Sequence, residues 1–471
     1  MFGLEEFGLS GGLLIAFLIC ILTVFIFEFV NGFHDTANAV ATVIYTKTLK
    51  PLHAVLWSGF MNFLGVVCSS YLFGMAVASK IASLLPLETV LSKNINEAIA
   101  MVLAAIIGAI IWNLGTWYFG IPCSSSHTMI GSLLGVGIAF SMLPDHSNKI
   151  GVNWGEAYKI GNALLFSPLF GFSMAIALMF LLKRLIKEKQ IFKEPDPESK
   201  PPLWIRAILI TTCTLVSFFH GSNDGQKGVG LMLIVLLAFL PTQYALSPNF
   251  DKAAMSNQLF AMEEVLISES KTNFELESTL CAKASRLNSF GNYVKDLDQK
   301  SSKAVMSARK QMSILGKEMK ILLAEPNAIS SEANQKTIKK GVSMMSNYTT
   351  HVPTWTIILI SVALGIGTMI GWKRIVVTIG EKIGKRHMTY AEGASAELIA
   401  SSTIGLASGL GLPVSTTHVL SSGVAGAMVA SKGVKNLQSG TVKNIVLAWV
   451  LTLPATIIIS ASLFFLFRLF I

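Results

Sequence analysis

The chain has 471 residues, of which 52% are hydrophobic and only 14% are charged, whereas about 25% of the residues of an ordinary soluble domain are charged. This composition excludes a soluble protein and predicts an all-α, polytopic membrane protein whose first partner is the lipid bilayer. The net charge of +10 does not indicate nucleic-acid binding, because the basic residues cluster beside apolar segments, where cytoplasmic loops carry them.

Eight apolar segments approach the roughly 20 residues that an α-helix needs to cross a bilayer. They cover residues 13–30, 52–78, 98–119, 158–182, 204–240, 355–372, 396–412 and 445–467. The chain begins MFGLEEFGLS, which lacks the basic start of a cleavable signal peptide, so we expect the first segment to be retained. The cysteines occur singly along the chain, a spacing that predicts neither disulfides nor a metal site.

Two related halves are separated by residues 183–202, a charged and proline-rich stretch that cannot enter lipid and is predicted to be a cytoplasmic linker. The tetrapeptide GFHD (32–35) of the first half, residues 1–182, recurs as GSND (221–224) in the second. Likewise, GIPCSSSHTMIGSLLG (120–135) recurs as GLPVSTTHVLSSGVAG (411–426). The sequence therefore predicts two transmembrane repeats.

The second repeat contains a polar stretch, residues 245–350, between its two motifs. Runs such as KDLDQKSSKAVMSARKQMSILGKEMK within it are typical of helices in water. We expect an inserted soluble helical domain that divides the second repeat into residues 203–244 and 351–471. No motif in the insertion indicates a binding or catalytic site.

Lysine and arginine concentrate in one set of short loops, which predicts that these loops are cytoplasmic and that the two repeats have opposite orientations. The polar motifs interrupt long apolar stretches, residues 10–46 and 203–240, so we expect both helices to bend or break there. Residues 98–142 and 396–430 would form either re-entrant hairpins or pairs of full crossings. Inverted repeats with broken helices are typical of secondary transporters, whose substrate site lies near the membrane midplane.

Asp35 and Asp224, at matching positions of the two repeats, are the strongest candidates for a coupling-ion site. A charged carboxylate in the bilayer centre costs roughly 2.5–3.5 kcal/mol, so such residues generally face a cavity and serve a function. Asn38, one helical turn after Asp35, and Asn223 would add amide oxygens. This set suits Na⁺ or a relayed proton, and the ordinary alternative is an aspartate that caps a half-helix.

Three consecutive hydroxyl residues follow a proline in each half. Prolines favour the first turn of a helix, and the free N–H groups of a helix start bind phosphate. The predicted phosphate-binding residues are Ser124, Ser125, Ser126, Ser415, Thr416 and Thr417. Ordinary helix capping is the alternative, but the duplication inside apolar segments favours a function.

Other polar residues in apolar segments are candidates for the transport pathway or for balancing charge: Gln226, Lys227, His127, His418 and Glu397. The histidines, together with His34 and His220, could relay protons or pack with satisfied hydrogen bonds. Lys227 takes the position that Asn38 has in the first repeat, so it fills a cation site, neutralises a bound anion or only pairs with Asp224. No nucleotide-binding or hydrolase motif is present, which predicts a protein that is not an enzyme, has no cofactor and is driven by an ion gradient.

The stretches GFHDTANAVAT, GSNDGQKGVG, PCSSSHT and PVSTTHV resemble the paired signatures of the inorganic phosphate transporter (Pit) family, in particular bacterial low-affinity permeases of the PitA type. The resemblance covers the chain apart from the insertion. The family's second signature usually has asparagine at the position of Lys227, and this departure argues against a second Na⁺ site.

The resemblance implies a multi-pass protein of the bacterial inner membrane that imports phosphate by symport with protons. The phosphate would enter as a neutral complex with a divalent metal such as Mg²⁺, Ca²⁺ or Zn²⁺, so the metal belongs to the substrate. Three alternatives stay open: Na⁺ coupling, another oxyanion such as sulfate or arsenate, and a membrane receptor that only senses phosphate. A homodimer is also compatible with the sequence.

Overall fold

The computed structural model describes residue 9 and residues 11–72, 74–85, 95–144, 151–196, 199–273, 275–326 and 328–470, without the side chains of residues 36–38. Over these residues it is all-helical, as the sequence predicts, and it forms two compact units. We call the first, with residues up to 235 and from 353 onwards, the membrane unit, and the second, residues 236–352, the inserted unit.

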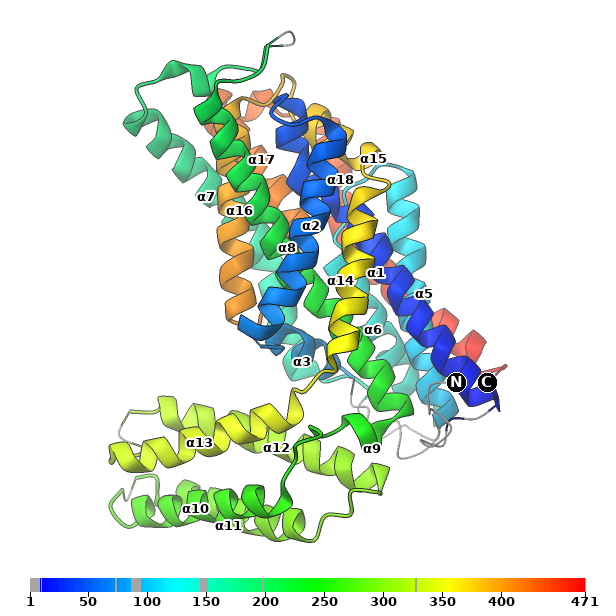
Figure 1. The fold of residues 1–471 in the computed structure, drawn as a ribbon, viewed down its shortest axis with the longest axis vertical. Helices are drawn as coiled ribbons and strands as arrows, with labels where there is room; N and C mark the ends of the chain where they lie inside the picture. The colour runs from blue at the N-terminus through cyan, green and yellow to red at the C-terminus, as the bar shows by residue number, and fades with distance from the viewer. Residues whose placement is uncertain are drawn as a thin grey trace. The chain divides into compact units, whose positions relative to one another are not determined.

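The membrane unit contains most of the helices (Figure 1). Among the described residues, six helices are long and apolar enough to cross a membrane, namely α1 (Gly11–Tyr45), α2 (Pro51–Leu72), α5 (Ile95–Tyr118), α7 (Trp154–Leu185), α8 (Leu203–Phe239) and α18 (Ser439–Phe467). The shorter ones are α3 (Ala76–Ala82), α6 (Ser125–Ser141), α14 (Thr354–Met369), α15 (Lys373–Val377), α16 (Tyr390–Gly409) and α17 (Thr416–Lys432). The chain is therefore a multi-span membrane protein.

The inserted unit is built from α9 (Pro241–Tyr244), α10 (Lys252–Ser270), α11 (Glu277–Lys295), α12 (Ser302–Ala324) and α13 (Glu332–Thr349). Its α10 packs against α11 and α13, and leucine and methionine side chains such as Leu259 and Met312 are buried in its core. Burial alone raises the pKa of the Glu269 carboxyl, but hydrogen bonds from Asn334 and Ser330 outweigh burial and lower it. The unit has its own apolar core, as a soluble domain requires.

Both α1 and α8 run unbroken through their polar motifs, so a break, one of the two distortions expected there, is wrong. The reason is that a break would strip backbone N–H and C=O groups of their partners in a region without water. An unbroken helix satisfies the backbone internally and leaves only the polar side chains to find partners. The 35 residues of α1 extend roughly 50 Å at about 1.5 Å per residue, more than the ~30 Å of hydrocarbon.

The first two helices of each half pack against those of the other half. On α2, Gly65 lies against the carbonyl of Phe218 in α8, so closely that a Cβ at Gly65 would overlap it. About two turns away on α2, Ser58 shares a hydrogen bond of 2.9 Å with Ser217 of α8. In the same way α1 packs against α14. Small residues allow this close approach, which is how helices associate in membranes.

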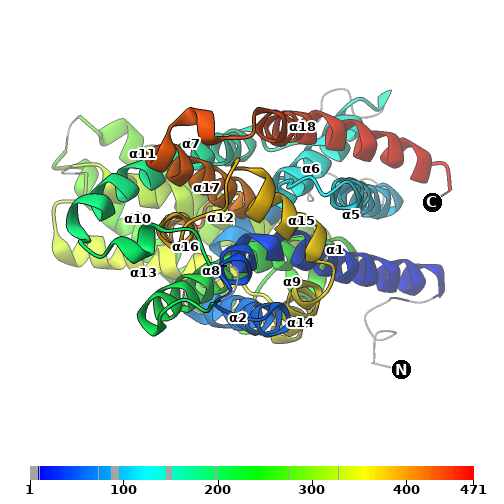
Figure 2. The ribbon, with the colours of Figure 1, turned by 90° about the horizontal axis from the view of Figure 1, so that it is seen from above.

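Two helical hairpins, α5–α6 and α16–α17, complete the membrane unit. Each packs against the last helix of the other half, α6 against α18 and α17 against α7 (Figure 2). The helices α6 and α17 start beside each other, because Ser126 Oγ donates to Val414 O over 2.9 Å. They end at opposite ends of α7. Gly137 of α6 faces Gly151, which lies just before the start of α7. At the other end, Lys183 in the last turn of α7 donates to Ala430 O of α17. Opposed directions of this kind are what inverted repeats predict.

Candidate functional site

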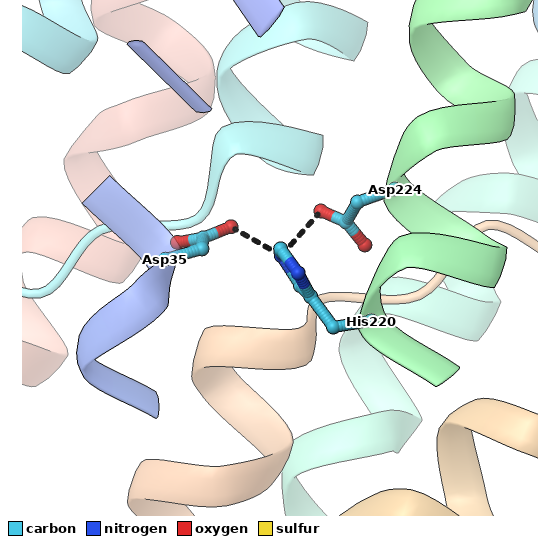
Figure 3. Close-up of side chains that lie close together, drawn as sticks. All are labelled: Asp35, His220 and Asp224. Atoms are coloured by element: carbon cyan, nitrogen blue, oxygen red, sulfur yellow. Dashed lines mark ion pairs between the residues drawn. The ribbon is translucent and has the colours of Figure 1, made fainter. Parts of the chain in front are cut away.

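Polar side chains of α1 and α8 meet the first residues of α6 and α17 inside the membrane unit. Figure 3 shows three of these side chains, Asp35 of α1 with His220 and Asp224 of α8. The two predicted carboxylates lie here, and Asp35 and Asp224 are 2% and 0% exposed. Buried charges are stable only when they are paired and hydrogen-bonded. The partners of these two carboxylates therefore define the site.

Asp35 is bonded to both hairpins. Ser125 Oγ of α6 donates to its Oδ2 over 3.2 Å, and Thr417 Oγ1 of α17 donates to its Oδ1 over 2.6 Å. His34 Nδ1 lies 3.3 Å from the same Oδ1. The structure thus brings a predicted ion-binding carboxylate into direct contact with two of the predicted phosphate-binding hydroxyls.

Asp224 is paired with Lys227, one helical turn further along α8. The Lys227 ammonium donates to Asp224 Oδ1 over 2.7 Å, to Val414 O over 2.9 Å and to Ser126 Oγ. These three bonds use all three N–H groups of the ammonium. Lys227 is 1% exposed, so its charge is fully enclosed, and it connects α8 to the starts of both hairpin helices.

His220 lies between the two aspartates (Figure 3). Its Nε2 is 3.7 Å from Asp35 Oδ2 and 3.8 Å from Asp224 Oδ2. Its other ring nitrogen, Nδ1, lies 2.8 Å from Asn62 Oδ1. The sequence predicts for His220 only a proton relay or a packing residue, although its position four residues before Asp224 places both on one helix face. That spacing is the sequence signal that places His220 beside Asp224.

The six predicted phosphate-binding residues all lie at the two helix starts, but their hydroxyls have different partners. Ser124 and Ser415 cap α6 and α17, each accepting a hydrogen bond of 3.1 Å from the backbone N–H of the histidine three residues later. Thr416 Oγ1 is buried and has no hydrogen-bond partner among the described residues. For Ser124 and Ser415 the capping function is thus observed directly.

The histidines that follow these caps stack on each other across the two hairpins. The rings of His127 and His418 are 4.5 Å apart at 34°, and His418 also stacks on Trp449 of α18 at 4.2 Å. His127 Nδ1 lies 2.8 Å from Ser124 Oγ. These contacts hold the hairpin starts together, and proton relay by the pair stays a prediction.

Two predicted pathway residues bind elsewhere in the described structure. Glu397 accepts hydrogen bonds from Thr42 and, over 2.5 Å, from Thr212, between α1 and α8. Gln226 Oε1 accepts from Val77 N of α3 over 3.2 Å. The side chain of Asn38 lies outside the described residues. Neither Glu397 nor Gln226 is bonded to the two aspartates.

The described hydrogen bonds of Asn223 all go to the end of the α16–α17 hairpin. Its Nδ2 donates to Ser408 Oγ and Leu412 O, both over 3.1 Å, and its Oδ1 accepts from Val414 N over 3.2 Å. These bonds give the amide a structural role beside the predicted one as a coupling-ion ligand, which stays a prediction, because Oδ1 accepts one of them and keeps a second lone pair. The geometry favours a residue that positions the start of α17.

The sequence pattern of the phosphate transporter family matches residues 31–460. The chain belongs to the phosphate transporter family. It is 39% identical to the low-affinity inorganic phosphate transporter PitB of Escherichia coli (strain K12), over 95% of each chain. It is 38% identical to PitA of the same organism, over 97% of each chain. Membership makes the chain a membrane transporter of phosphate and not an enzyme, as the sequence predicts.

The fold is also found in a solved structure. The sodium-dependent phosphate transporter superposes with a TM-score of 0.54, covering 97% of this chain and 100% of its own, at 21% sequence identity. At this identity the likeness concerns the fold alone. The two proteins therefore share the arrangement of helices described above.

Replacing Asn223 with alanine is expected to lower the midpoint of thermal unfolding of the purified transporter. The change leaves the backbone groups of Val414 and Leu412 without partners, and a buried unpaired group costs about 1–3 kcal/mol. Asn444→Ala, an exposed position of α18, is the matched control. If Asn223→Ala unfolds like the wild type but has altered ion dependence of uptake, Asn223 is an ion ligand and the positioning role is wrong.

Proposed function

We propose that the chain is a low-affinity symporter that imports inorganic phosphate across the bacterial inner membrane. The observation that carries the proposal is the meeting of two helix starts, α6 and α17, beside two buried aspartates. Free N–H groups and hydroxyls at a helix start favour a phosphate anion. Phosphate would be held there by Ser125, Ser126, Thr416 and Thr417, with Ser124 and Ser415 shaping the two starts.

A shared set of hydroxyls would couple phosphate to the driving ion. Ser125 and Thr417 donate to Asp35 in the structure, and a phosphate needs the same two donors. A proton or Na⁺ on Asp35 weakens the attraction of its oxygens for these hydroxyls. Ion binding would thereby free the donors for phosphate, so the two would bind together.

The charge of the cluster favours a neutral metal phosphate as cargo. Asp35, Asp224 and Lys227 together carry one negative charge, and an unbalanced buried charge is costly. HPO₄²⁻ alone would add two further negative charges, and moving it against ~100 mV costs about 4.6 kcal/mol at 2.3 per charge. A neutral metal phosphate adds none, and a single accompanying cation then neutralises the cluster.

Lys227 supports protons over Na⁺ as the coupling ion. Its ammonium is held by three oxygens, those of Asp224, Val414 and Ser126, which are the kind of ligands that a hard cation takes. The lysine thus occupies a place that a cation would otherwise use. Na⁺ coupling is the second candidate, favoured by the carboxylate and hydroxyl oxygens around Asp35.

Uptake of labelled phosphate into proteoliposomes tests the proposal. We expect uptake driven by an imposed H⁺ gradient and stimulated by Mg²⁺, and no stimulation by a Na⁺ gradient. Uptake that follows only the Na⁺ gradient would show that Na⁺, and not a proton, is the coupling ion. Stronger competition by sulfate or arsenate than by unlabelled phosphate would show that the competing anion is the preferred substrate. Absence of flux under every gradient would overturn the transporter proposal in favour of a receptor.

A further inference from the structure

A pocket of about 620 Å³ lies between the end of α5 and the segment that follows α14. Its lining contains none of the residues of the candidate site. In the part of the chain that the structure describes, three basic side chains and no acidic one line it, and we call it the basic pocket. The basic residues are Lys373, Arg374 and Lys382, and four aromatic residues, Trp117, Tyr118, Phe119 and Trp372, line it as well. A pocket with this charge favours an anionic ligand.

Arg374 is held in the basic pocket by the end of α5. Its guanidinium carbon lies 5.2 Å from the centre of the Trp117 ring and 5.1 Å from that of the Tyr118 ring, close enough for a cation to be attracted to both rings. Its Nη1 also donates a hydrogen bond of 2.6 Å to Tyr118 O. A guanidinium has five N–H donors in one plane, so this bond leaves donors that match two oxygens of a phosphate group.

Two further hydrogen bonds join the walls of the basic pocket. Trp117 Nε1 donates to Gly371 O, and Thr378 Oγ1 donates to Gly120 O, both over 2.8 Å. Gly120 and Gly371 have φ angles of 66° and 75°, which glycine adopts more readily than other residues. These two tight turns place the bonded carbonyls at the pocket. The walls are therefore held by the protein itself, as in a preformed ligand site.

The basic pocket lies at the level where membrane and water meet. The spanning helix α5 ends at Tyr118, and the side chains of Tyr118 and Phe119 are 61% and 74% exposed. Exposed aromatic rings at the end of a membrane helix are typical of the headgroup level. Lys373, Arg374 and Lys382 belong to one of the basic loops that the sequence predicts to be cytoplasmic. The headgroups of the cytoplasmic leaflet are then within reach of these side chains.

A lipid headgroup and free phosphate both offer the phosphate oxygens that the basic side chains can bind. The exposed rings of Tyr118 and Phe119 favour the lipid, because free phosphate has no apolar part for them to contact. Basic pockets between membrane helices on the cytoplasmic side bind anionic lipid headgroups.

We propose that the basic pocket binds the phosphate headgroup of an anionic phospholipid of the cytoplasmic leaflet. Arg374 pairs with the phosphate oxygens, and Lys373 and Lys382 add charge attraction. The bound headgroup ties the turn between α5 and α6 to the membrane surface. This site goes beyond the proposed function and does not depend on it.

Native mass spectrometry of the purified full-length transporter, titrated with phosphatidylglycerol, tests the site. We expect one tightly retained lipid per chain, and phosphatidylcholine with the same acyl chains, which is net neutral, should bind at least about tenfold more weakly. Lys373→Gln combined with Lys382→Gln should weaken phosphatidylglycerol binding to a similar degree. Both lysines are exposed, so this double variant keeps the bonds of Arg374. Lys432→Gln combined with Lys435→Gln removes two exposed charges from another basic loop and should bind like the wild type.

Amide hydrogen exchange gives the position of the bound lipid. The turn at residues 118–121 should exchange more slowly when phosphatidylglycerol is added to the wild type, and it should not respond in the variant that lacks Lys373 and Lys382. An unchanged exchange rate in the wild type would overturn the assignment of the lipid to this pocket.

Three other results would contradict the proposal. Unchanged phosphatidylglycerol binding by the variant without Lys373 and Lys382 would overturn the site. An equal loss in the variant without Lys432 and Lys435 would show only unspecific attraction to basic loops. Displacement of the lipid by inorganic phosphate, but not by chloride at the same ionic strength, would show that the pocket takes the free anion. Since none of these measurements requires transport, failure of the proposed function would leave their results unchanged.

Discussion

Asp35→Asn is expected to abolish phosphate uptake while the protein still folds and inserts into the membrane. The asparagine keeps the shape and one oxygen acceptor for Ser125 or Thr417, but it removes the negative charge that holds the coupling cation in the proposed function. The expected loss is at least about a hundredfold, equivalent to roughly 2.7 kcal/mol. Uptake of labelled phosphate, normalised to the amount of transporter in the membrane, measures the effect.

Asp224→Asn is the informative companion of this variant. It also removes a carboxylate, but it leaves the enclosed Lys227 ammonium without its counter-charge, and breaking a buried pair costs about 3–5 kcal/mol. We therefore expect lost uptake together with a lower unfolding midpoint, whereas Asp35→Asn loses uptake alone. Glu188→Gln, an exposed residue of the linker, serves as the control. Normal uptake by Asp35→Asn would refute the role assigned to this carboxylate.

The duplicated motifs predict most of the site, because two matching polar segments inside apolar helices have to find each other. The bonds of Asp35 to Ser125 and Thr417 join residues that the sequence singles out. The multi-span, all-helical fold can likewise be predicted from the long apolar segments of the sequence. The assignment of the serine and threonine residues to phosphate itself is still a prediction.

Other features depend on contacts that a repeat cannot reveal. Asn223 is adjacent to Asp224 in the sequence, yet its amide binds the end of a hairpin almost two hundred residues away. The role of His220 depends on Asn62, which lies in another helix and has no distinctive motif. The breaks expected in α1 and α8 fail because backbone hydrogen bonding outweighs the local effect of glycine and polar side chains.

The two repeats differ at Lys227, and replacing this residue is expected to have the second large effect on phosphate uptake. Its ammonium is enclosed by Asp224 Oδ1, Val414 O and Ser126 Oγ, three oxygens of the type that bind Na⁺. The matching residue of the first repeat is Asn38, a neutral side chain that carries an oxygen. A single substitution therefore makes the two repeats alike at this position.

Lys227→Asn is expected to reduce proton-driven phosphate uptake at least about tenfold and to make the remaining uptake depend on Na⁺. Loss of the ammonium leaves Asp224 and the carbonyl of Val414 facing an empty space, and Na⁺ can supply the missing charge there. The control variant Lys227→Met offers no oxygen in place of the ammonium, so its uptake should not respond to Na⁺. Uptake into proteoliposomes at matched pH, with and without a Na⁺ gradient, measures both variants. If uptake by Lys227→Asn is lost under every gradient, the ammonium does not substitute for a coupling cation, and it then acts by binding phosphate or by pairing with Asp224.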